Sequence, residues 1–428
     1  MSGALNAVDA DDFAGLLRPF LPLSNPVAVA VSGGPDSMAL AFCAHRWAQQ
    51  NGHRCIGLIV DHNLRPDAAA EAAQTRDRLA AIGMESDILR WDHAPIASRL
   101  HEQARAARYR LLAGACRRHG ARDLLIAHHR DDQAETILMR LAKGSGIDGL
   151  AGMAAQRIDD SDAGNPVRIL RPFLSVARAR LAATCAAAGL PFVTDPSNAS
   201  DKFARGRLRA VMPLLAPEGF DADRLIDLGA RATEAADAID FYARALLRDH
   251  ASFETGGSIT LGLDALRETP KAVAARAVVL CLRHIHDDGP APERASLSAL
   301  LDAIMNGLDA PRTLHGCILS PGARAVTILR EAGTITDAQP FRDGDRIVWD
   351  KRWCVEGHAG CGDGILRALG TPPHDDIDRL APGLRRLVPQ GRVRAALPAL
   401  WRDGAIAAIP AFDKEAAFRL RYRKQPFP

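Results

Sequence analysis

"VAVAVSGGPDSMAL" (Val27–Leu40) is the stretch that decides the fold. The apolar run Val27–Val31 predicts a buried strand, and the apolar spacing after the turn predicts a helix over 37–49. Between them lies the segment Ser32–Ser37, with two glycines and a proline. Such a turn is typical of an anion site, because glycine lets backbone N–H groups converge and the helix N-terminus adds its positive dipole end.

The residues of this turn indicate which kind of anion site it can form. A Walker-type loop requires a Lys and a Ser or Thr after its last glycine, and no Lys follows Gly34. The negative charge of Asp36 would repel a phosphate, so the presence of this residue in the turn requires another explanation. Either Asp36 caps the helix, or it faces a Mg²⁺ ion that bridges to the phosphates. The residues alone leave both interpretations open.

Strand-like and helical stretches alternate through the first half of the chain. This alternation predicts a Rossmann-like parallel sheet with helices on both faces, which binds ligands at the carboxyl ends of its strands. The expected strands are Val27–Val31, Cys55–Val60, Ser86–Trp91 and Asp123–Ala127, and the expected helices cover 37–49, 68–82 and 96–119. After Pro and Gly residues near 214–221, we expect a helical and mixed domain over 217–335 and a small mixed α/β domain over 336–428. The first domain then covers 1–216.

Composition excludes several classes of protein. The chain has 428 residues, a net charge of +3, and no apolar run of the roughly 18–20 residues that span a bilayer. Its N-terminus lacks the basic start of a signal peptide. Eight scattered cysteines form no CxxC pair, which is typical of reduced thiols. We therefore expect a cytoplasmic protein without membrane contact.

A second motif, "HHRDDQAETILMRLAKGSGIDGLAGM" (His128–Met153), predicts a helix with one buried face, formed by Ala134, Ile137, Leu138 and Leu141. The residues expected on the other side are Asp132, Glu135, Thr136, Arg140 and Lys143. The Asp132 and Glu135 carboxylates lie three residues apart and repel each other unless a cation separates them. That cation can be a metal, an ammonium group or an arginine. The alternative is a helix cap followed by a solvated face.

These motifs carry a family resemblance. "SGGPDS" resembles the PP-loop of the ATP pyrophosphatases, which cleave ATP between its α- and β-phosphates. His128–Met153 is similar to the tRNA(Ile)-lysidine synthetase family. Further matching stretches are "VDHNLRPDA" (Val60–Ala68), "EQARAARYRLL" (Glu102–Leu112), "ILRPFL" (Ile169–Leu174), and "TDPSN" with "FARGRLRAVMPLL" (Thr194–Leu215). The resemblance covers about the first 215 residues, and Gly206 departs from the usual Arg-Asn-Arg pattern.

The resemblance implies a function. Enzymes of this family join free L-lysine to the wobble cytidine of an isoleucine tRNA with a CAU anticodon, through an adenylated cytidine. ATP and Mg²⁺ are the implied cofactors, the tRNA and lysine are the implied partners, and a homodimer is one candidate assembly. The middle domain would then contact tRNA, and the C-terminal domain is a candidate tRNA-binding domain.

The resemblance also implies roles for individual residues. The nucleotide-binding residues would be Ser32, Gly33, Gly34, Pro35, Asp36, Ser37, Asp61 and His62, with Mg²⁺ at Asp36. The catalytic residues would be Asp36, Arg108, His129, Asp132 and Glu135. The substrate-binding residues would be Asp132 and Glu135 for the ammonium groups of lysine, and Arg205, Arg207 and Arg209 for RNA. A solvated helix face is the alternative for Arg105 and Arg108.

Other activities remain in competition. A tRNA thiolating enzyme of the same ATPase fold usually carries CxxC pairs, and Cys43, Cys116 and Cys185 fall in predicted helices instead. An amidotransferase such as NAD or GMP synthetase needs an ammonia source. A non-catalytic RNA-binding protein would not need the intact "SGGPDS" and "DDQAET" motifs.

The C-terminal half mixes basic and aromatic residues, as RNA-binding segments do. One run combines Trp349 and Trp353 with Arg342, Arg346, Lys351 and Arg352, and a second covers Gly383–Trp401. An ordinary small domain with core tryptophans explains the same pattern.

Overall fold

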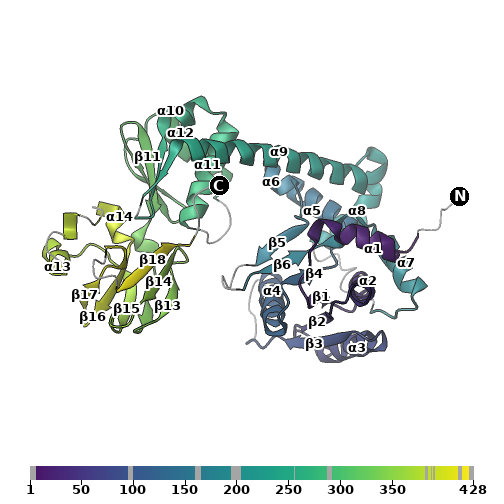
Figure 1. Cartoon of the computed structure of the whole chain (residues 1–428). Helices are drawn as coiled ribbons and strands as arrows, with labels where there is room; N and C mark the ends of the chain where they lie inside the picture. The colour runs from purple at the N-terminus through teal and green to yellow at the C-terminus, as the bar shows by residue number, and fades with distance from the viewer. Residues whose placement is uncertain are drawn as a thin grey trace. The chain divides into compact units, whose positions relative to one another are not determined.

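The computed structural model describes residues 6–94, 100–159, 165–193, 204–254, 256–286, 292–380, 384–386, 388, 391–412 and 417–423. The contacts of the chain separate it into two units, Met1–Ala236 and Asp237–Pro428 (Figure 1). Each unit is described by itself.

The N-terminal unit is built on a six-stranded sheet with the order β3-β2-β1-β4-β6-β5. Its strands are β1 (Val27–Val31), β2 (Cys55–Asp61), β3 (Glu85–Arg90), β4 (Asp123–Leu125), β5 (Gln156–Asp159) and β6 (Val167–Leu170). All neighbours pair in parallel except β5, which runs antiparallel to β6. The four predicted strands and the parallel sheet are confirmed. The sequence did not predict β5, because this largely exposed edge strand lacks an alternation of apolar and polar residues.

Both faces of this sheet are covered. Along β1, alternate side chains point to opposite faces: Val27, Val29 and Val31 join one core, and Ala28 and Ala30 join another. The first core includes residues of α1 (Ala10–Leu17), α2 (Pro35–Gln50) and α7 (Arg178–Ala187), and the second includes residues of α4 (Leu100–His119). The uninterrupted apolar run of β1 thus reflects burial on two sides.

The remaining helices of this unit are α3 (Ala68–Ala81), α5 (Arg130–Ala142), α6 (Ile147–Leu150), α8 (Ala204–Leu215) and the first part of α9 (Ala222–His250), with the 3₁₀ turns η1 (Arg18–Phe20), η2 (Pro172–Ser175) and η4 (Ala216–Glu218). One of them, α3, packs against β2 and β3, and α5 contacts α6, α8 and η2. The predicted helix over 96–119 is observed as α4 from Leu100 onward, and 96–99 lie outside the described residues.

The C-terminal unit contains three antiparallel sheets. The first has the order β7-β8-β11-β10-β9, and α10 (Leu263–Glu268), α11 (Lys271–Ile285) and α12 (Arg294–Met305) share its core. Its strands are β7 (Ala251–Phe253), β8 (Ile259–Gly262), β9 (Arg312–Leu314), β10 (Cys317–Pro321) and β11 (Ala325–Arg330). The second and third sheets have the orders β12-β15-β16-β17 and β13-β14-β18.

The strands of these two smaller sheets are β12 (Gln339–Phe341), β13 (Arg346–Trp349), β14 (Trp353–Gly357), β15 (Gly364–Ala368), β16 (Pro398–Arg402), β17 (Ala405–Ala408) and β18 (Phe418–Tyr422), joined by short helices such as α13 (His374–Asp378) and α14 (Gly391–Ala395). Their core contains Trp349 and Trp353, which are 0% and 3% exposed. Both tryptophans are therefore core residues, not surfaces for stacking RNA bases. We retain the domain boundary at 335 as a proposal, which the separate cores of these sheets support.

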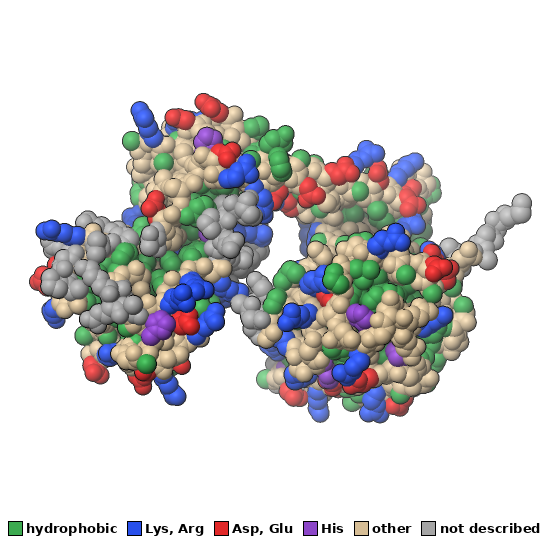
Figure 2. Space-filling model, in the orientation of Figure 1, with side chains coloured by type: hydrophobic (Ala, Val, Ile, Leu, Met, Phe, Trp, Pro, Cys, Tyr) green, Lys and Arg blue, Asp and Glu red, His purple; other side chains and the backbone are tan. Residues whose placement is uncertain are grey.

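The surface carries charges of both signs. Basic and acidic side chains are interspersed over the face of the molecule in Figure 2, in keeping with a net charge of only +3. In the described part of the chain, no helix is both long enough and apolar enough to cross a membrane.

Candidate active site

The segment Ser32–Ser37, here called the PP-loop turn, joins the carboxyl end of β1 to the N-terminus of α2. The Ser32 N–H donates to Ser37 Oγ at 3.1 Å, and the Ser37 hydroxyl donates to the Gly34 carbonyl at 3.0 Å. Gly33 has φ = +82°, a backbone angle that other residues rarely adopt. The turn is therefore closed by its own hydrogen bonds and lies at the N-terminus of α2, a position that favours anions.

Neighbouring elements hold the PP-loop turn from outside. A Cβ atom at Gly33 would lie 2.5 Å from the Thr75 hydroxyl of α3. The Val193 N–H donates to the Gly33 carbonyl at 2.9 Å, and the Cys185 thiol of α7 donates to the Pro35 carbonyl at 3.2 Å. These contacts fix the turn before any ligand arrives, which reduces the entropy cost of binding.

Asp36 lies in the first turn of α2 but does not cap that helix. The N-cap residue is Gly34, and no side chain caps this end. One Asp36 oxygen, Oδ2, lies 3.6 Å from His129 Nε2, and the other, Oδ1, lies 3.8 Å from Arg178 Nε. Asp36 Oδ1 is buried and accepts no hydrogen bond from the described residues. Since Mg²⁺ in nucleotide sites is held by one or two carboxylates together with phosphates, this oxygen suits such an ion.

His129 forms the N-cap of α5 and is only 3% exposed. Its Nδ1 accepts the Asp132 N–H at 3.3 Å, while Asp132 Oδ2 accepts the His129 N–H at 3.2 Å. This reciprocal capping box orients the imidazole so that Nε2 faces Asp36 and lies 3.4 Å from Asp132 Oδ2. Burial lowers the pKa of His129, but Asp36, Asp132 and Asp131 together outweigh burial and raise it.

The buried face of α5 differs from the sequence prediction. Ala134, Ile137 and Leu138 are buried as expected, but Leu141 is 40% exposed. The residues that we expected on the other side include Glu135 and Thr136, which are 3% and 8% exposed. The cause is that α5 contacts α6, α8 and η2, so more than one side of the helix is covered. Glu135 is therefore a buried carboxylate next to the better exposed Asp132.

A cavity of about 380 Å³ lies beside the PP-loop turn, at the carboxyl ends of β1 and β2. Ser32, Asp61, His62 and Arg108 line it, together with residues of α3. Asp61 is buried and accepts the Asn63 N–H at 2.8 Å. Burial lowers the pKa of His62, and the positive charge of Arg108 lowers it further. The cavity thus offers neutral imidazole, carboxylate and guanidinium groups to a nucleotide.

The predicted site residues fall into three groups. The PP-loop turn, His129 and Asp132 meet at Asp36, and Asp61, His62 and Arg108 line the adjoining cavity. Arg207 lies exposed on α8, whereas the side chains of Arg205 and Arg209 lie outside the described residues. The predicted segment 194–203 also lies outside them.

Sequence reasoning missed two residues that touch the site, Arg178 and Thr75. Both reach the PP-loop turn only through tertiary contacts. The signal for Arg178 was weak, because it is one of two arginines in "VARAR".

The three cysteines that the sequence places in helices are indeed helical, and seven of the eight cysteines are buried. Cys43, Cys116 and Cys185 lie in α2, α4 and α7 and are buried. Burial raises the pKa of the Cys43 and Cys116 thiols to about 12. Sulfur transfer needs an accessible thiolate, so these residues do not support a thiolating enzyme.

Comparison with known proteins identifies relatives over most of the chain. A PP-loop domain family matches residues 8–215. A tRNA(Ile)-lysidine synthase of Methylobacterium sp. (strain 4-46) is 42% identical over 74% of this chain and 94% of that protein. The corresponding protein of Rhodopseudomonas palustris is 42% identical over 75% of this chain and 89% of its own length.

A more distant relative matches nearly the whole chain. The tRNA(Ile)-lysidine synthase of Ruegeria pomeroyi is 32% identical over 95% of this chain and 94% of its own length. The PP-loop turn, the capping box at His129 and these matches agree, and the chain belongs to the tRNA(Ile)-lysidine synthase family.

Proposed function

We propose that this chain joins free L-lysine to the wobble cytidine of the CAU anticodon of an isoleucine tRNA, with release of AMP and pyrophosphate. Family membership makes the chain an ATP-dependent ligase with tRNA(Ile)-lysidine synthase activity, and the anticodon and mechanism are the proposed refinement. Because tRNA and ATP are its substrates, we also propose a cytoplasmic location. A homodimer remains a candidate assembly.

The chemistry consists of two substitutions. The cytosine carbonyl oxygen attacks the α-phosphorus of ATP, and the bond to the β-phosphate breaks and releases pyrophosphate. The lysine ε-amine then attacks the former carbonyl carbon, loses a proton, and AMP departs with the oxygen. Activation replaces a poor leaving group with a good one, so that one difficult step becomes two easier ones.

The PP-loop turn and its surroundings would hold ATP. Backbone N–H groups of Gly33 and Gly34 are suited to the β- and γ-phosphates, and Ser32 and Ser37 would join them by exchanging the hydrogen bonds that close the turn. Asp36 would hold Mg²⁺, which neutralises phosphate charge when bound, and its buried Oδ1 supports this role. Asp61 and His62 in the adjoining cavity would contact the nucleoside, and Arg108 would stabilise the charge of departing pyrophosphate.

Lysine and tRNA would meet this nucleotide at the N-terminus of α5. Asp132 and Glu135 would attract the ammonium groups of lysine, since opposite charge in a cleft distinguishes lysine from neutral amino acids. His129 would stay positioned between Asp132 and Asp36. Arg205, Arg207 and Arg209 are the proposed contacts to phosphates or to the unstacked base.

The observation that carries this proposal is the 3.6 Å contact between His129 and Asp36, because it unites the phosphate turn with the acidic start of α5. The direct test is mass analysis of an isoleucine tRNA transcript after incubation with the protein, ATP and lysine. We expect a mass increase at the anticodon cytidine that requires both ATP and lysine, with one AMP released per product. A transcript that gains sulfur, or that stays unchanged while ATP is consumed, would contradict the proposal.

A further inference from the structure

An arginine cluster surrounds Tyr109 on α4. The Tyr109 cluster consists of Tyr109, Arg105, Arg108, Arg157 and Arg171. The Arg157 and Arg105 guanidinium carbons lie 4.8 Å and 5.2 Å from the centroid of the tyrosine ring. The Arg105 Nη2 also lies 3.5 Å from the Tyr109 hydroxyl. Of these residues, the proposed mechanism uses only Arg108.

The positive charge of the Tyr109 cluster is not neutralised locally. Within the described part of the chain, none of its four arginines forms an ion pair with a carboxylate, whereas Arg117 on the same helix lies 3.0 Å from Asp159. Burial lowers the pKa of Arg171, Tyr109 acts in the opposite direction, and the charges of Arg157 and Arg105 add smaller lowering effects. Arginines that repel one another in this way are typical of a site that awaits an anion.

The cluster adjoins the active site on two sides. Arg108 lines the cavity beside the PP-loop turn. Arg171 is 6% exposed; its Nε donates to His128 Nδ1 at 3.1 Å, and its Nη1 donates to the Ala154 carbonyl at 2.7 Å. His128 immediately precedes the N-cap residue of α5. An anion held at this cluster would therefore lie next to the reacting groups.

The exposure of the four arginines indicates which kind of anion the Tyr109 cluster would bind. Arg105 and Arg157 are exposed, while Arg108 and Arg171 lie deeper, so that the cluster extends from solvent toward the cavity. The PP-loop turn already provides for the phosphates of ATP. A polyanion that arrives from solvent suits the exposed arginines better, because guanidinium groups hold phosphates through paired hydrogen bonds. Two guanidinium groups over the Tyr109 ring also compete with base stacking there.

We propose that the Tyr109 cluster binds the phosphodiester backbone of the tRNA next to the cytidine that is modified. This inference rests on the proposed function, and it adds a surface that positions the substrate. Arg105 and Arg157 would make the outer phosphate contacts, and Arg171 would link them to the start of α5.

The test compares an Arg105→Ala/Arg157→Ala variant with wild type in tRNA binding at several salt concentrations. We expect the Kd for tRNA to rise about 10-fold or more, and the slope of log K against log[salt] to become shallower by about 1–2. The Kd for ATP should stay within about twofold, because RNA phosphate and not ATP is the ligand. An Arg105→Lys/Arg157→Lys variant keeps both charges and should recover most of the affinity for tRNA.

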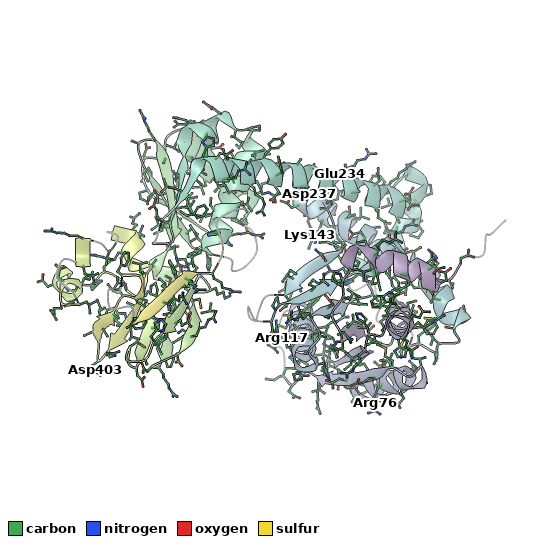
Figure 3. All side chains as sticks on the ribbon, in the orientation of Figure 1. Arg76, Arg117, Lys143, Glu234, Asp237 and Asp403 are labelled. Carbon is green, nitrogen blue, oxygen red and sulfur yellow. The ribbon has the colours of Figure 1, made fainter. Side chains whose placement is uncertain are left out.

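Arg76→Ala is the matched control. Arg76 is an exposed arginine on α3, labelled in Figure 3, and it lies 3.0 Å from Asp77. Its loss should leave both Kd values unchanged. Unchanged tRNA affinity and salt slope in the Arg105→Ala/Arg157→Ala variant would overturn the inference, as would a weaker affinity for ATP alone, which would assign the cluster to the triphosphate. Binding is measured apart from product formation, so a wild type that binds tRNA but forms no lysidine would refute only the proposed function.

Discussion

His129 Nε2 lies 3.6 Å from Asp36 Oδ2, so that the cap of α5 meets the PP-loop turn in one site. The two residues come from the ends of neighbouring parallel strands, β4 and β1. Carboxyl ends of adjacent parallel strands share one edge of the sheet, which places these distant residues together.

This contact gives a pH dependence with a defined sign. The pKa of folded His129 is raised above its ordinary value of 6.5, against the effect of burial, chiefly by Asp36 and then by Asp132. A His129 pKa that is higher in the folded state than in the unfolded state stabilises the fold at pH values below the unfolded-state pKa. This stabilisation is lost as the pH rises through the folded-state pKa. We therefore expect the Tm difference between wild type and Asp36→Asn to be larger at about pH 6 than at about pH 8.5. Thermal unfolding across this range measures it, and a difference that grows with pH would contradict the raised pKa.

Substitutions of Asp36 and Asp132 should affect different chemical steps. Asp36→Ala should abolish ATP–pyrophosphate exchange in the presence of tRNA, because the proposed Mg²⁺ ligand is lost. Asp132→Ala should retain much of the exchange but block incorporation of radiolabelled lysine. Full lysine transfer by the Asp132→Ala variant would refute the lysine-binding role of this residue.

Gly33 and Gly34 offer a matched pair of substitutions. Gly33→Ala places a Cβ against the Thr75 hydroxyl at φ = +82°, and left-handed backbone alone costs an L-residue about 1–2 kcal/mol. At Gly34 the nearest atom, Ser32 Oγ, would lie 3.8 Å from a new Cβ, an ordinary contact. Thermal unfolding without ATP should show a larger fall in Tm for Gly33→Ala than for Gly34→Ala, which loses only the preference for glycine over alanine at the N-cap of α2. Equal Tm values for the two variants would contradict the strained geometry of the turn.

The local features of the site were predictable from the sequence, and the tertiary ones were not. The PP-loop turn was predictable because a strand, two glycines and a helix follow one another along the chain. The capping box could also have been found, since His129 and Asp132 have its three-residue spacing. Arg178 and Thr75 approach the turn from other elements, which no local pattern reveals. The burial of Glu135 was missed because periodicity describes one packed face, whereas α5 is packed on several sides.

The glycine-rich segment after α5 is held by side chains of that helix. Gln133 donates to the Met153 carbonyl at 3.0 Å and accepts the Met153 N–H at 2.7 Å, and Arg140 donates to the Gly149 and Gly152 carbonyls. Gln133→Ala removes both bonds to Met153, with a cost of about 1–3 kcal/mol. Hydrogen exchange of 144–153 should therefore become about fivefold faster or more.

Lys143→Ala is the control for this experiment. Lys143 is the exposed residue that ends the same helix, and Figure 3 shows it at that end. Its loss should leave hydrogen exchange of 144–153 unchanged. Equal exchange in Gln133→Ala and wild type would mean that the segment is held by other contacts.

The basic run in the C-terminal unit divides into structural and surface residues. Arg352 is 3% exposed and its Nε donates to Asp350 Oδ2 at 2.6 Å, while Asp350 also binds Arg330 of β11. Arg342 and Lys351 are exposed. An Arg342→Glu/Lys351→Glu variant should therefore weaken tRNA binding and make its salt slope shallower by about 1–2, without change in Tm or in ATP binding.

An Arg352→Ala variant distinguishes a role in the fold from a role in tRNA binding. Its loss leaves Asp350 and Arg330 in a buried site with one partner fewer, and breaking a buried ion pair costs about 3–5 kcal/mol. We therefore expect a lower Tm for the C-terminal unit, in contrast to the surface variant. Measurements of tRNA affinity by filter binding and of Tm by calorimetry distinguish the two variants. If the surface variant binds tRNA as wild type does at every salt concentration, these exposed charges are not tRNA contacts, and the C-terminal basic run serves the fold alone.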